Sequence, residues 1–240
     1  MTESAGAATK GGLLDDLLEI FIAPSRVFER RRHGGYGGLL LVLVLLTAAI
    51  MVATMSLSAP YWDAQFDVSM RQAAERGQAM PPEATGEAAR TAARWFGAIA
   101  GAVFIPIFVW IGALFVMLGA KVAGTSLSYK QGATIFTLAG VPRLLSPILM
   151  AVQGLIADPA TVRSISDASL GPARFMDPVT TSPMVIGVLS NFDVINLWAF
   201  VLVAIGISVM GRVSRAAGFV GMGIVFACTL ALTLIPAALA

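Results

Sequence analysis

The sequence predicts an all-α, polytopic integral membrane protein with five transmembrane helices. Of its 240 residues, 57% are hydrophobic and 12% are charged, whereas soluble domains carry about 25% charged residues. Five apolar windows are close to the length of about 20 residues that a helix needs to cross roughly 30 Å of hydrocarbon. The windows lack the apolar/polar alternation of barrel strands, so helices are the only element that satisfies their backbone in lipid.

The five windows divide the chain into two parts. They cover residues 37–58, 95–120, 132–157, 193–210 and 216–236. Residues 1–36 form a cytoplasmic N-terminal segment, and residues 37–240 form a five-span membrane domain. Within this domain, residues 59–94 and 158–192 are the two longer loops, which we expect on the outer side.

An amphipathic interfacial helix is predicted before the first span. Its apolar face consists of Leu13, Leu14, Leu17, Leu18 and Phe21, opposite Asp15, Asp16 and Glu19. This helix lies at the membrane boundary in one interpretation and docks a cytoplasmic partner in the other. In both, the pair Asp15–Asp16 belongs to an exposed polar face and is not a metal site.

Basic residues next to the short connections predict the orientation, because positive charge is retained on the cytoplasmic side. These residues are Arg26, Arg30, Arg31, Arg32, Lys121, Lys130, Arg212 and Arg215. All of them fall on one side of the five-span arrangement, which places the N-terminus in the cytoplasm and the C-terminus outside. We expect the four arginines before the first span, Arg26 and Arg30 to Arg32, to contact anionic lipid headgroups.

The two outer loops are expected to contain helices. Trp62, Phe66 and Met70 recur at intervals of four residues, which indicates a helix lying on the outer interface. A second helix is expected to begin after Pro82 and to continue into the second span. In the other loop, Ser182 is a plausible N-cap, with Pro183 at the first helical position; this short helix lies flat or dips into the membrane.

Small residues within the spans predict close helix packing. Gly97 and Gly101 form a GxxxG pair, and Gly206 and Gly211 enrich the fourth span in small residues. Packing within one bundle is the favoured interpretation, and a dimer interface is the alternative.

Arg143 is the most unusual residue of the spans, because it is a permanent charge inside an apolar run and lies between Pro142 and Pro147. The two prolines predict a helix kink that frees backbone carbonyls. These carbonyls could accept from the guanidinium, which would make Arg143 a structural staple. Alternatively, Arg143 belongs to an intramembrane polar site with Asn191, Asp193 and Asn196 and contacts an anion or a lipid headgroup.

Signatures of catalysis are missing from the sequence. It has one histidine, His33, and one cysteine, Cys228, so a Ser-His or Cys-His arrangement, an HExxH motif and a disulfide framework are not expected. A net charge of +2 does not suggest a nucleic-acid partner. We therefore expect no enzymatic activity, no cofactor and no metal.

Three stretches resemble bacterial proteins of the Yip1 domain family. They are "LLDDLLEIFIAPSRVFERRR", "FTLAGVPRLLSPIL" and "NFDVINLWAFVLVAIGISVMGRVSRAAGFVGMGIVFA". The resemblance covers most of residues 13–237 and implies about five spans, a cytoplasmic N-terminus and no known enzymatic reaction. Eukaryotic members interact with small GTPases, but the short N-terminal segment and longer outer loops of this chain depart from their pattern. Some bacterial members accompany export transporters.

The function expected from these observations is that of a non-enzymatic accessory or scaffold protein of the bacterial cytoplasmic (inner) membrane. Its expected partners are membrane lipids and either another membrane protein, such as an export transporter, or a second copy of the chain; a role in membrane organisation is also compatible. The alternative is a transporter or lipid-handling protein with a site around Arg143. Five spans without an internal duplication argue against that alternative.

Overall fold

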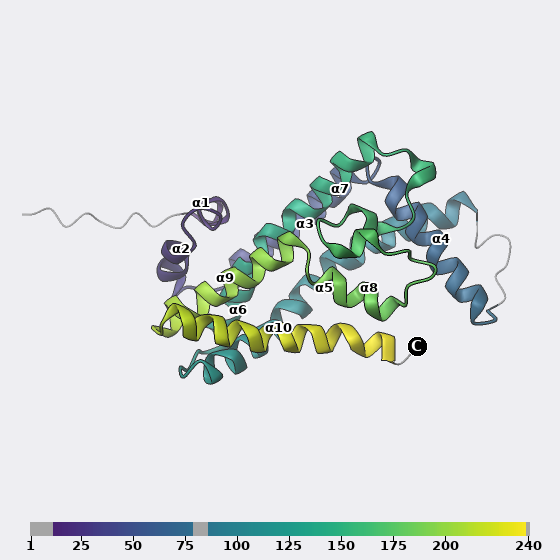
Figure 1. Cartoon of the computed structure of the whole chain (residues 1–240). Helices are drawn as coiled ribbons and strands as arrows, with labels where there is room; N and C mark the ends of the chain where they lie inside the picture. Colours follow the sequence, from purple (N-terminus) through teal and green to yellow (C-terminus); the bar gives the residue numbers. More distant parts are fainter. Residues whose placement is uncertain (1–11, 79–85, 239–240) are drawn as a thin grey trace, which may run out of the picture.

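The computed structural model describes residues 12–78 and 86–238, whose secondary structure consists of helices and contains no strand (Figure 1). The α-helices are α1 (Leu13–Glu19), α2 (Pro24–Arg31), α3 (Gly37–Thr54), α4 (Ala59–Glu75), α5 (Glu87–Val122), α6 (Tyr129–Ala139), α7 (Leu145–Ile156), α8 (Pro183–Ser190), α9 (Val194–Gly211) and α10 (Arg215–Ala238). Short 3₁₀ helices are η2 (Val141–Leu144), η3 (Pro159–Thr161), η4 (Ile165–Ala168) and η5 (Pro172–Phe175).

The five predicted spans are confirmed. Five helices are long and apolar enough to cross a membrane: α3, α5, the combined α6–η2–α7, α9 and α10. Helix α5 has 36 residues, about 54 Å at 1.5 Å per residue, and therefore extends well beyond the hydrocarbon. It continues from the outer loop into the second span, as expected, although the proposed start near Pro82 lies outside the described residues.

Helix α9 is the most buried span, with 56% of its apolar window buried against 17% for α3 and for α10. It packs against α2, α6 and α10, while α5 packs against α6 and α10. The remaining faces of α3, α5 and α10 carry exposed apolar side chains. These faces are suited to contact lipid.

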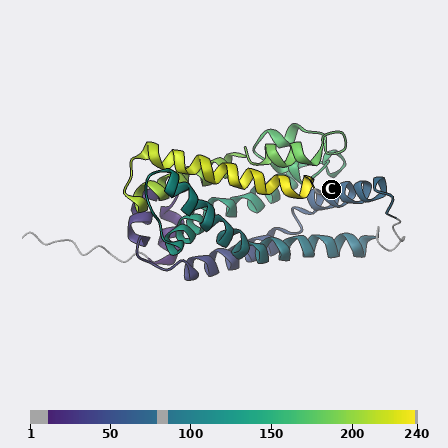
Figure 2. The ribbon, with the colours of Figure 1, turned by 90° about the horizontal axis from the view of Figure 1, so that it is seen from below.

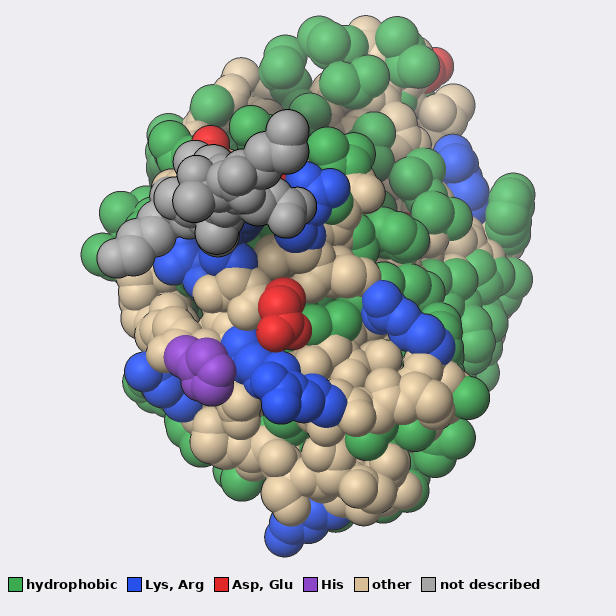
Figure 3. Space-filling model, turned by 90° about the vertical axis from the view of Figure 1, so that its left-hand side faces the viewer, with side chains coloured by type: hydrophobic (Ala, Val, Ile, Leu, Met, Phe, Trp, Pro, Cys, Tyr) green, Lys and Arg blue, Asp and Glu red, His purple; other side chains and the backbone are tan. Residues whose placement is uncertain are grey.

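The helix ends and connections that contain the predicted basic residues lie at one end of the bundle, here called the basic end, together with α1 and α2 (Figures 1 and 2). Hydrogen bonds join its connections: Arg215 Nη2 donates to Ser25 Oγ at 2.7 Å, and Thr125 Oγ1 donates to the Gly211 carbonyl at 2.9 Å. Figure 3 views this end and shows Lys and Arg side chains spread across it. Helices α4, α7 and α8 lie toward the opposite end.

The predicted packing glycines all face neighbours in the same chain. A Cβ at Gly97 would lie 2.7 Å from the Trp62 ring, one at Gly206 would lie 2.7 Å from Ile135, and one at Gly211 would lie 2.6 Å from Thr125. Gly101 has more room, with Met51 Cε at 3.4 Å. These contacts fit the favoured interpretation of packing within one bundle.

The tightest crossing of α5 and α10 involves a glycine that the sequence analysis did not single out. A Cβ at Gly119 of α5 would lie 2.3 Å from the carbonyl oxygen of Gly221 in α10, and a Cβ at Gly221 would lie 2.8 Å from the Gly119 oxygen. The two backbones therefore touch directly. Both helices can approach this closely only because neither position has a side chain.

Asp16 joins α1 to α2 through a buried ion-pair cluster. Its side chain is fully buried, whereas the side chains of Arg30 and Arg31 keep about 20% exposure. Arg30 Nε donates to Asp16 Oδ1 at 2.9 Å, and Arg31 Nε donates to Asp16 Oδ2. Hydrogen bonds to Asp16 and then to Glu19 raise the pKa of the Arg30 guanidinium above its ordinary value. The expectation of an exposed Asp16 is wrong because α2 folds back over this side of α1.

Replacing Gly119 by Ala is expected to destabilise the protein by about 1–3 kcal/mol, because the added methyl group overpacks the α5–α10 crossing. The matched control is Gly223→Ala in α10, where nothing lies within 4 Å of an added Cβ and alanine is the better helix former. The melting temperatures of the two purified variants and of the unaltered protein are measured by thermal unfolding in mild detergent. Equal melting temperatures for the two variants would contradict the close crossing.

Replacing Asp16 by Asn is expected to cost roughly 3 kcal/mol, because it removes the buried counter-ion of two arginines. Asp15→Asn, on the exposed side of the same helix, is the control and should change stability by less than about 1 kcal/mol. Denaturant unfolding, followed by the fluorescence of a dye attached to α1, gives the difference. A negligible cost for Asp16→Asn would show that the cluster does not hold α1 in place.

Candidate functional site

Arg143 lies where the third span changes its helical form. Helix α6 ends at Ala139, the chain makes the 3₁₀ turn η2 with Pro142 in its first half, and α7 begins at Leu145. Pro147 is the third residue of α7, where a missing N–H removes no intrahelical hydrogen bond. The interruption predicted from the two prolines is therefore present as a 3₁₀ turn. This turn directs the partly buried Arg143 toward α9.

The guanidinium of Arg143 meets a side-chain amide. Its Nε donates to Asn196 Oδ1 at 3.0 Å, and Asn196 Nδ2 donates in turn to the Ser190 carbonyl at 3.0 Å. Among the described residues, the guanidinium donates to no backbone carbonyl, and no carboxylate lies within ion-pair distance of it. The carbonyl-bound staple proposed from the sequence is therefore not formed.

The other predicted partners of Arg143 point elsewhere. Asn191 Nδ2 donates to the Gly187 carbonyl at 2.9 Å, within the last turn of α8. Asp193 caps α9 through the Ile195 N–H and accepts from Ser169 Oγ at 2.8 Å and from the Leu170 N–H at 2.6 Å. Asp193 thus anchors the second outer loop and is not the counter-ion of Arg143. Of the predicted cluster, the structure brings together only Arg143 and Asn196.

Two cavities adjoin at this pair. An apolar cavity of about 270 Å³, here called the inner cavity, lies between α3, α5 and the third span and has Arg143 as its one charged lining residue. A larger cavity of about 590 Å³, here called the outer cavity, is bordered by Asn196, Asp193, several serines and α4. Met51 and Pro147 line both cavities. Arg143 therefore lies between an apolar space and a more polar one.

The terminal nitrogens of Arg143, Nη1 and Nη2, have no hydrogen-bond partner among the described residues. No fully buried side-chain nitrogen or oxygen of the described part lacks a partner, so neither of these nitrogens is completely enclosed by the protein. An arginine costs about 2.5–3.5 kcal/mol at the centre of a span on insertion scales, and less nearer to the border. One neutral amide compensates little of that cost.

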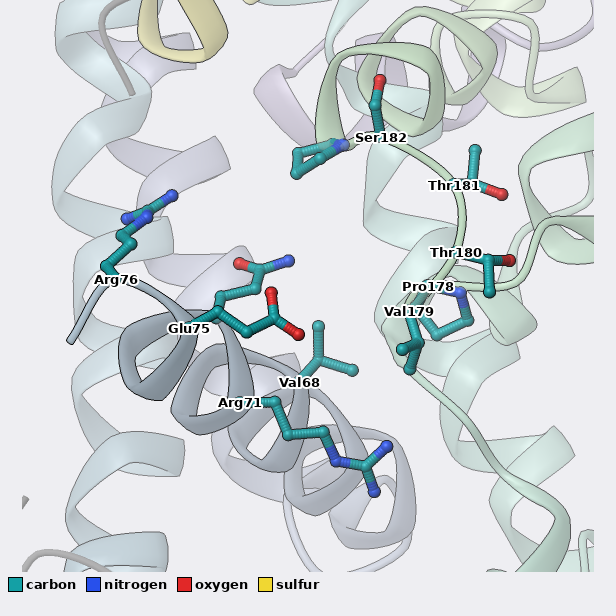
Figure 4. Close-up of a pocket in the computed structure, with 11 residues that line it drawn as sticks. Val68, Arg71, Glu75, Arg76, Pro178, Val179, Thr180, Thr181 and Ser182 are labelled. Atoms are coloured by element: carbon teal, nitrogen blue, oxygen red, sulfur yellow. The ribbon is translucent and has the colours of Figure 1, made fainter. Parts of the chain in front are cut away.

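A third cavity, of about 330 Å³, separates α4 from the second outer loop. Figure 4 shows Arg71 and Glu75 of α4 and Arg76, which directly follows the helix, on one side and Pro178 to Ser182 on the other. These charged side chains are exposed and of both signs. Exposed charges in water contribute little binding energy, so this cavity is the weaker candidate.

The arginines expected to contact lipid headgroups have mostly internal roles. Arg30 and Arg31 bind Asp16, and Arg32 Nη2 donates to the Met210 carbonyl at 2.8 Å. Arg26 remains 76% exposed, with Glu19 at 3.2 Å. A headgroup contact stays a prediction, and Arg26 is the member of the set best placed for it.

Helix α1 carries two apolar stripes in place of the single predicted face. Leu17 is buried in the core, and Leu13 and Phe21 pack against it. The second stripe consists of Leu14 and Leu18 of α1 and of Ile22 in the turn after it, which are 65%, 74% and 85% exposed. This exposed stripe lies at the basic end without a partner among the described residues. Its position at a membrane interface stays a prediction.

Comparisons with known proteins agree with this architecture. "Membrane protein YknW" of Bacillus subtilis (strain 168) is 27% identical over 228 residues, which cover 93% of this chain and 89% of the relative. No solved structure matches the chain. The sequence profile of the Yip1 domain matches residues 18–235, nearly the whole chain. The chain therefore belongs to the Yip1 domain family.

Proposed function

We propose that this Yip1-family protein is a non-enzymatic accessory protein of the bacterial cytoplasmic membrane, with its basic end in the cytoplasm. In this proposal it binds the cytoplasmic edge of another membrane protein, an export transporter being the expected kind of partner. The exposed stripe of Leu14 and Leu18 on α1 and Ile22 in the turn after it is the observation that carries the proposal. The positive-inside rule supports the orientation.

The stripe is held rigidly, as a docking surface requires. The buried Asp16 cluster fixes α1 to α2, and Val27 and Phe28 of α2 are fully buried in the core. Ordering of this segment is therefore already complete before a partner arrives. A preformed surface binds with a smaller entropic cost than a mobile one.

The charge around the stripe favours a protein partner over a lipid surface. Helix α1 has no basic residue, and its acidic residues Asp16 and Glu19 are paired with arginines of α2, which leaves Asp15 as its exposed charge. Helices that bind anionic membranes are instead rich in Lys and Arg. The exposed Asp15 would repel anionic headgroups. The cytoplasmic edges of other membrane proteins carry an excess of Lys and Arg and complement such a surface.

Replacing Leu18 by Glu is expected to reduce the recovery of a co-purified membrane protein about tenfold or more, because it places a charge in the centre of the contact. The protein is purified in mild detergent from its native membranes, and the stoichiometry of any partner is measured by mass spectrometry. A matched pair of alanine variants serves as the control, because Leu45→Glu would place a charge on a helix that faces lipid. Leu18→Ala should lower the recovery of the partner, whereas Leu45→Ala in α3, at a position that is 59% exposed, should not.

A photo-crosslinking residue at position 18 supplies a second readout. It should join one defined membrane protein, whereas the same residue at position 45 should react with lipid. A monomer without any partner, or crosslinks from position 18 to lipid only, would contradict the proposal. Crosslinks between two copies of the chain would replace the accessory role with a homo-oligomer.

A further inference from the structure

We infer that Arg143 and the inner cavity form a binding site for one anionic phospholipid of the leaflet opposite the basic end. The phosphate binds the terminal nitrogens of Arg143, and an acyl chain occupies the inner cavity. The site is separate from the partner contact on α1, so either can exist without the other.

The charge of Arg143 calls for an anion. Its Nε is bound to Asn196 Oδ1 at 3.0 Å, but the guanidinium has no counter-ion among the described residues. The two terminal nitrogens are accessible, and together they offer the planar pair of donors that suits a phosphate. Asn196 binds the guanidinium through Nε, and a phosphate contact through Nη1 and Nη2 does not need this nitrogen.

The inner cavity suits a hydrocarbon chain. From the level of Arg143 and Met51 it extends toward the basic end, to Leu43 of α3, Val109 of α5 and Phe136 of α6. Apart from Arg143, these residues and the rest of the lining carry no charge. On the lipid side, Gly101 and Phe108 of α5 are exposed, which gives a chain a lateral entrance.

The depth of Arg143 matches the leaflet opposite the basic end. Its partner Asn196 lies 15 residues before Gly211, the last residue of α9, which is about 22 Å along the helix. With the basic end at one border of roughly 30 Å of hydrocarbon, the guanidinium lies about 8 Å inside the other border. The guanidinium is therefore closer to the headgroups of that leaflet than to those at the basic end.

The polar and apolar regions of the protein follow one another in the same order as the headgroup, phosphate and acyl chains of a phospholipid of that leaflet. From that surface inward lie the outer cavity, which has serines, Asp193 and Asn196 among its apolar lining residues, then Arg143, and then the apolar inner cavity. A phospholipid of that leaflet presents its headgroup, its phosphate and its acyl chains in the same order. A lipid of the leaflet at the basic end would meet these regions in the opposite order, with its headgroup on the side of the apolar inner cavity.

The test is native mass spectrometry of the full chain released from nanodiscs of equal phosphatidylglycerol and phosphatidylcholine. We expect one retained phosphatidylglycerol per protein, with about tenfold less in Arg143→Gln, since a charge-assisted hydrogen bond is lost. Gly101→Leu should reduce retention to a similar extent by blocking the entrance while Arg143 is unchanged. Arg212→Gln removes an exposed charge at the basic end and should retain the lipid like the unaltered protein.

Folding of each variant is checked by size-exclusion chromatography and helix content, and Gly101→Leu decides the matter if Arg143→Gln does not fold. Equal retention in Gly101→Leu and in the unaltered protein, or equal retention of phosphatidylcholine, would overturn the inference. Inorganic phosphate should not raise the melting temperature in lipid-free detergent, whereas phosphatidylglycerol should. Stabilisation by inorganic phosphate alone would assign the site to a free anion.

Discussion

Hydrocarbon contains no water, so every polar group inside the bilayer needs a partner within the protein. The spans meet this requirement through helical backbone bonds and through hydroxyl groups that return to their own helix. Thr137 Oγ1 donates to the Ala133 carbonyl at 2.7 Å, and Thr229 Oγ1 donates to the Val225 carbonyl at 2.9 Å. Among the described residues, no buried side-chain polar atom lacks a partner. Against this background, the accessible terminal nitrogens of Arg143 stand apart.

The chain solves the problem of a buried charge in two different ways. At the basic end, the fully buried carboxylate of Asp16 receives two guanidinium groups, so its charge is more than neutralised inside the protein. In the third span, Arg143 receives one neutral amide and borders two cavities. In the Asp16 cluster each charge has a partner inside the protein, so the cluster serves the fold and offers no free charge to a ligand. An unsaturated charge beside open space retains the capacity to bind an anion.

Local sequence patterns predicted the elements, and tertiary contacts decided which of their faces were used. Apolar windows located the five spans, and the Ser182–Pro183 pair correctly indicated the start of α8, where Ser182 Oγ accepts from the Val185 N–H. The pairing of Arg143 with Asn196 could be proposed because both residues are polar and lie in neighbouring spans. The burial of Asp16 could not, because an Asp on a short amphipathic helix looks the same whether or not α2 covers it.

The glycines illustrate the same limit. Gly97 and Gly206 were found because small residues recur around them, whereas the role of Gly119 is recognised only from its contact with Gly221, on a helix that follows about a hundred residues later. Similarly, the exposed stripe on α1 could not be separated from the buried one. Leu17 and Leu18 are neighbours in the sequence, and only the docking of α1 decides which of them faces the core.

Helix α9 connects the two ends of the molecule that carry the two proposals. Its first turn presents Asn196 to Arg143, and near its last turn the Met210 carbonyl accepts from Arg32, which directly follows α2. These contacts are separated by about 20 Å of helix, whereas the effects of substitutions couple mainly over less than about 10 Å. Changes at Arg143 and changes at Leu18 should therefore act on stability almost additively. The lipid site and the partner contact can be dissected by independent variants.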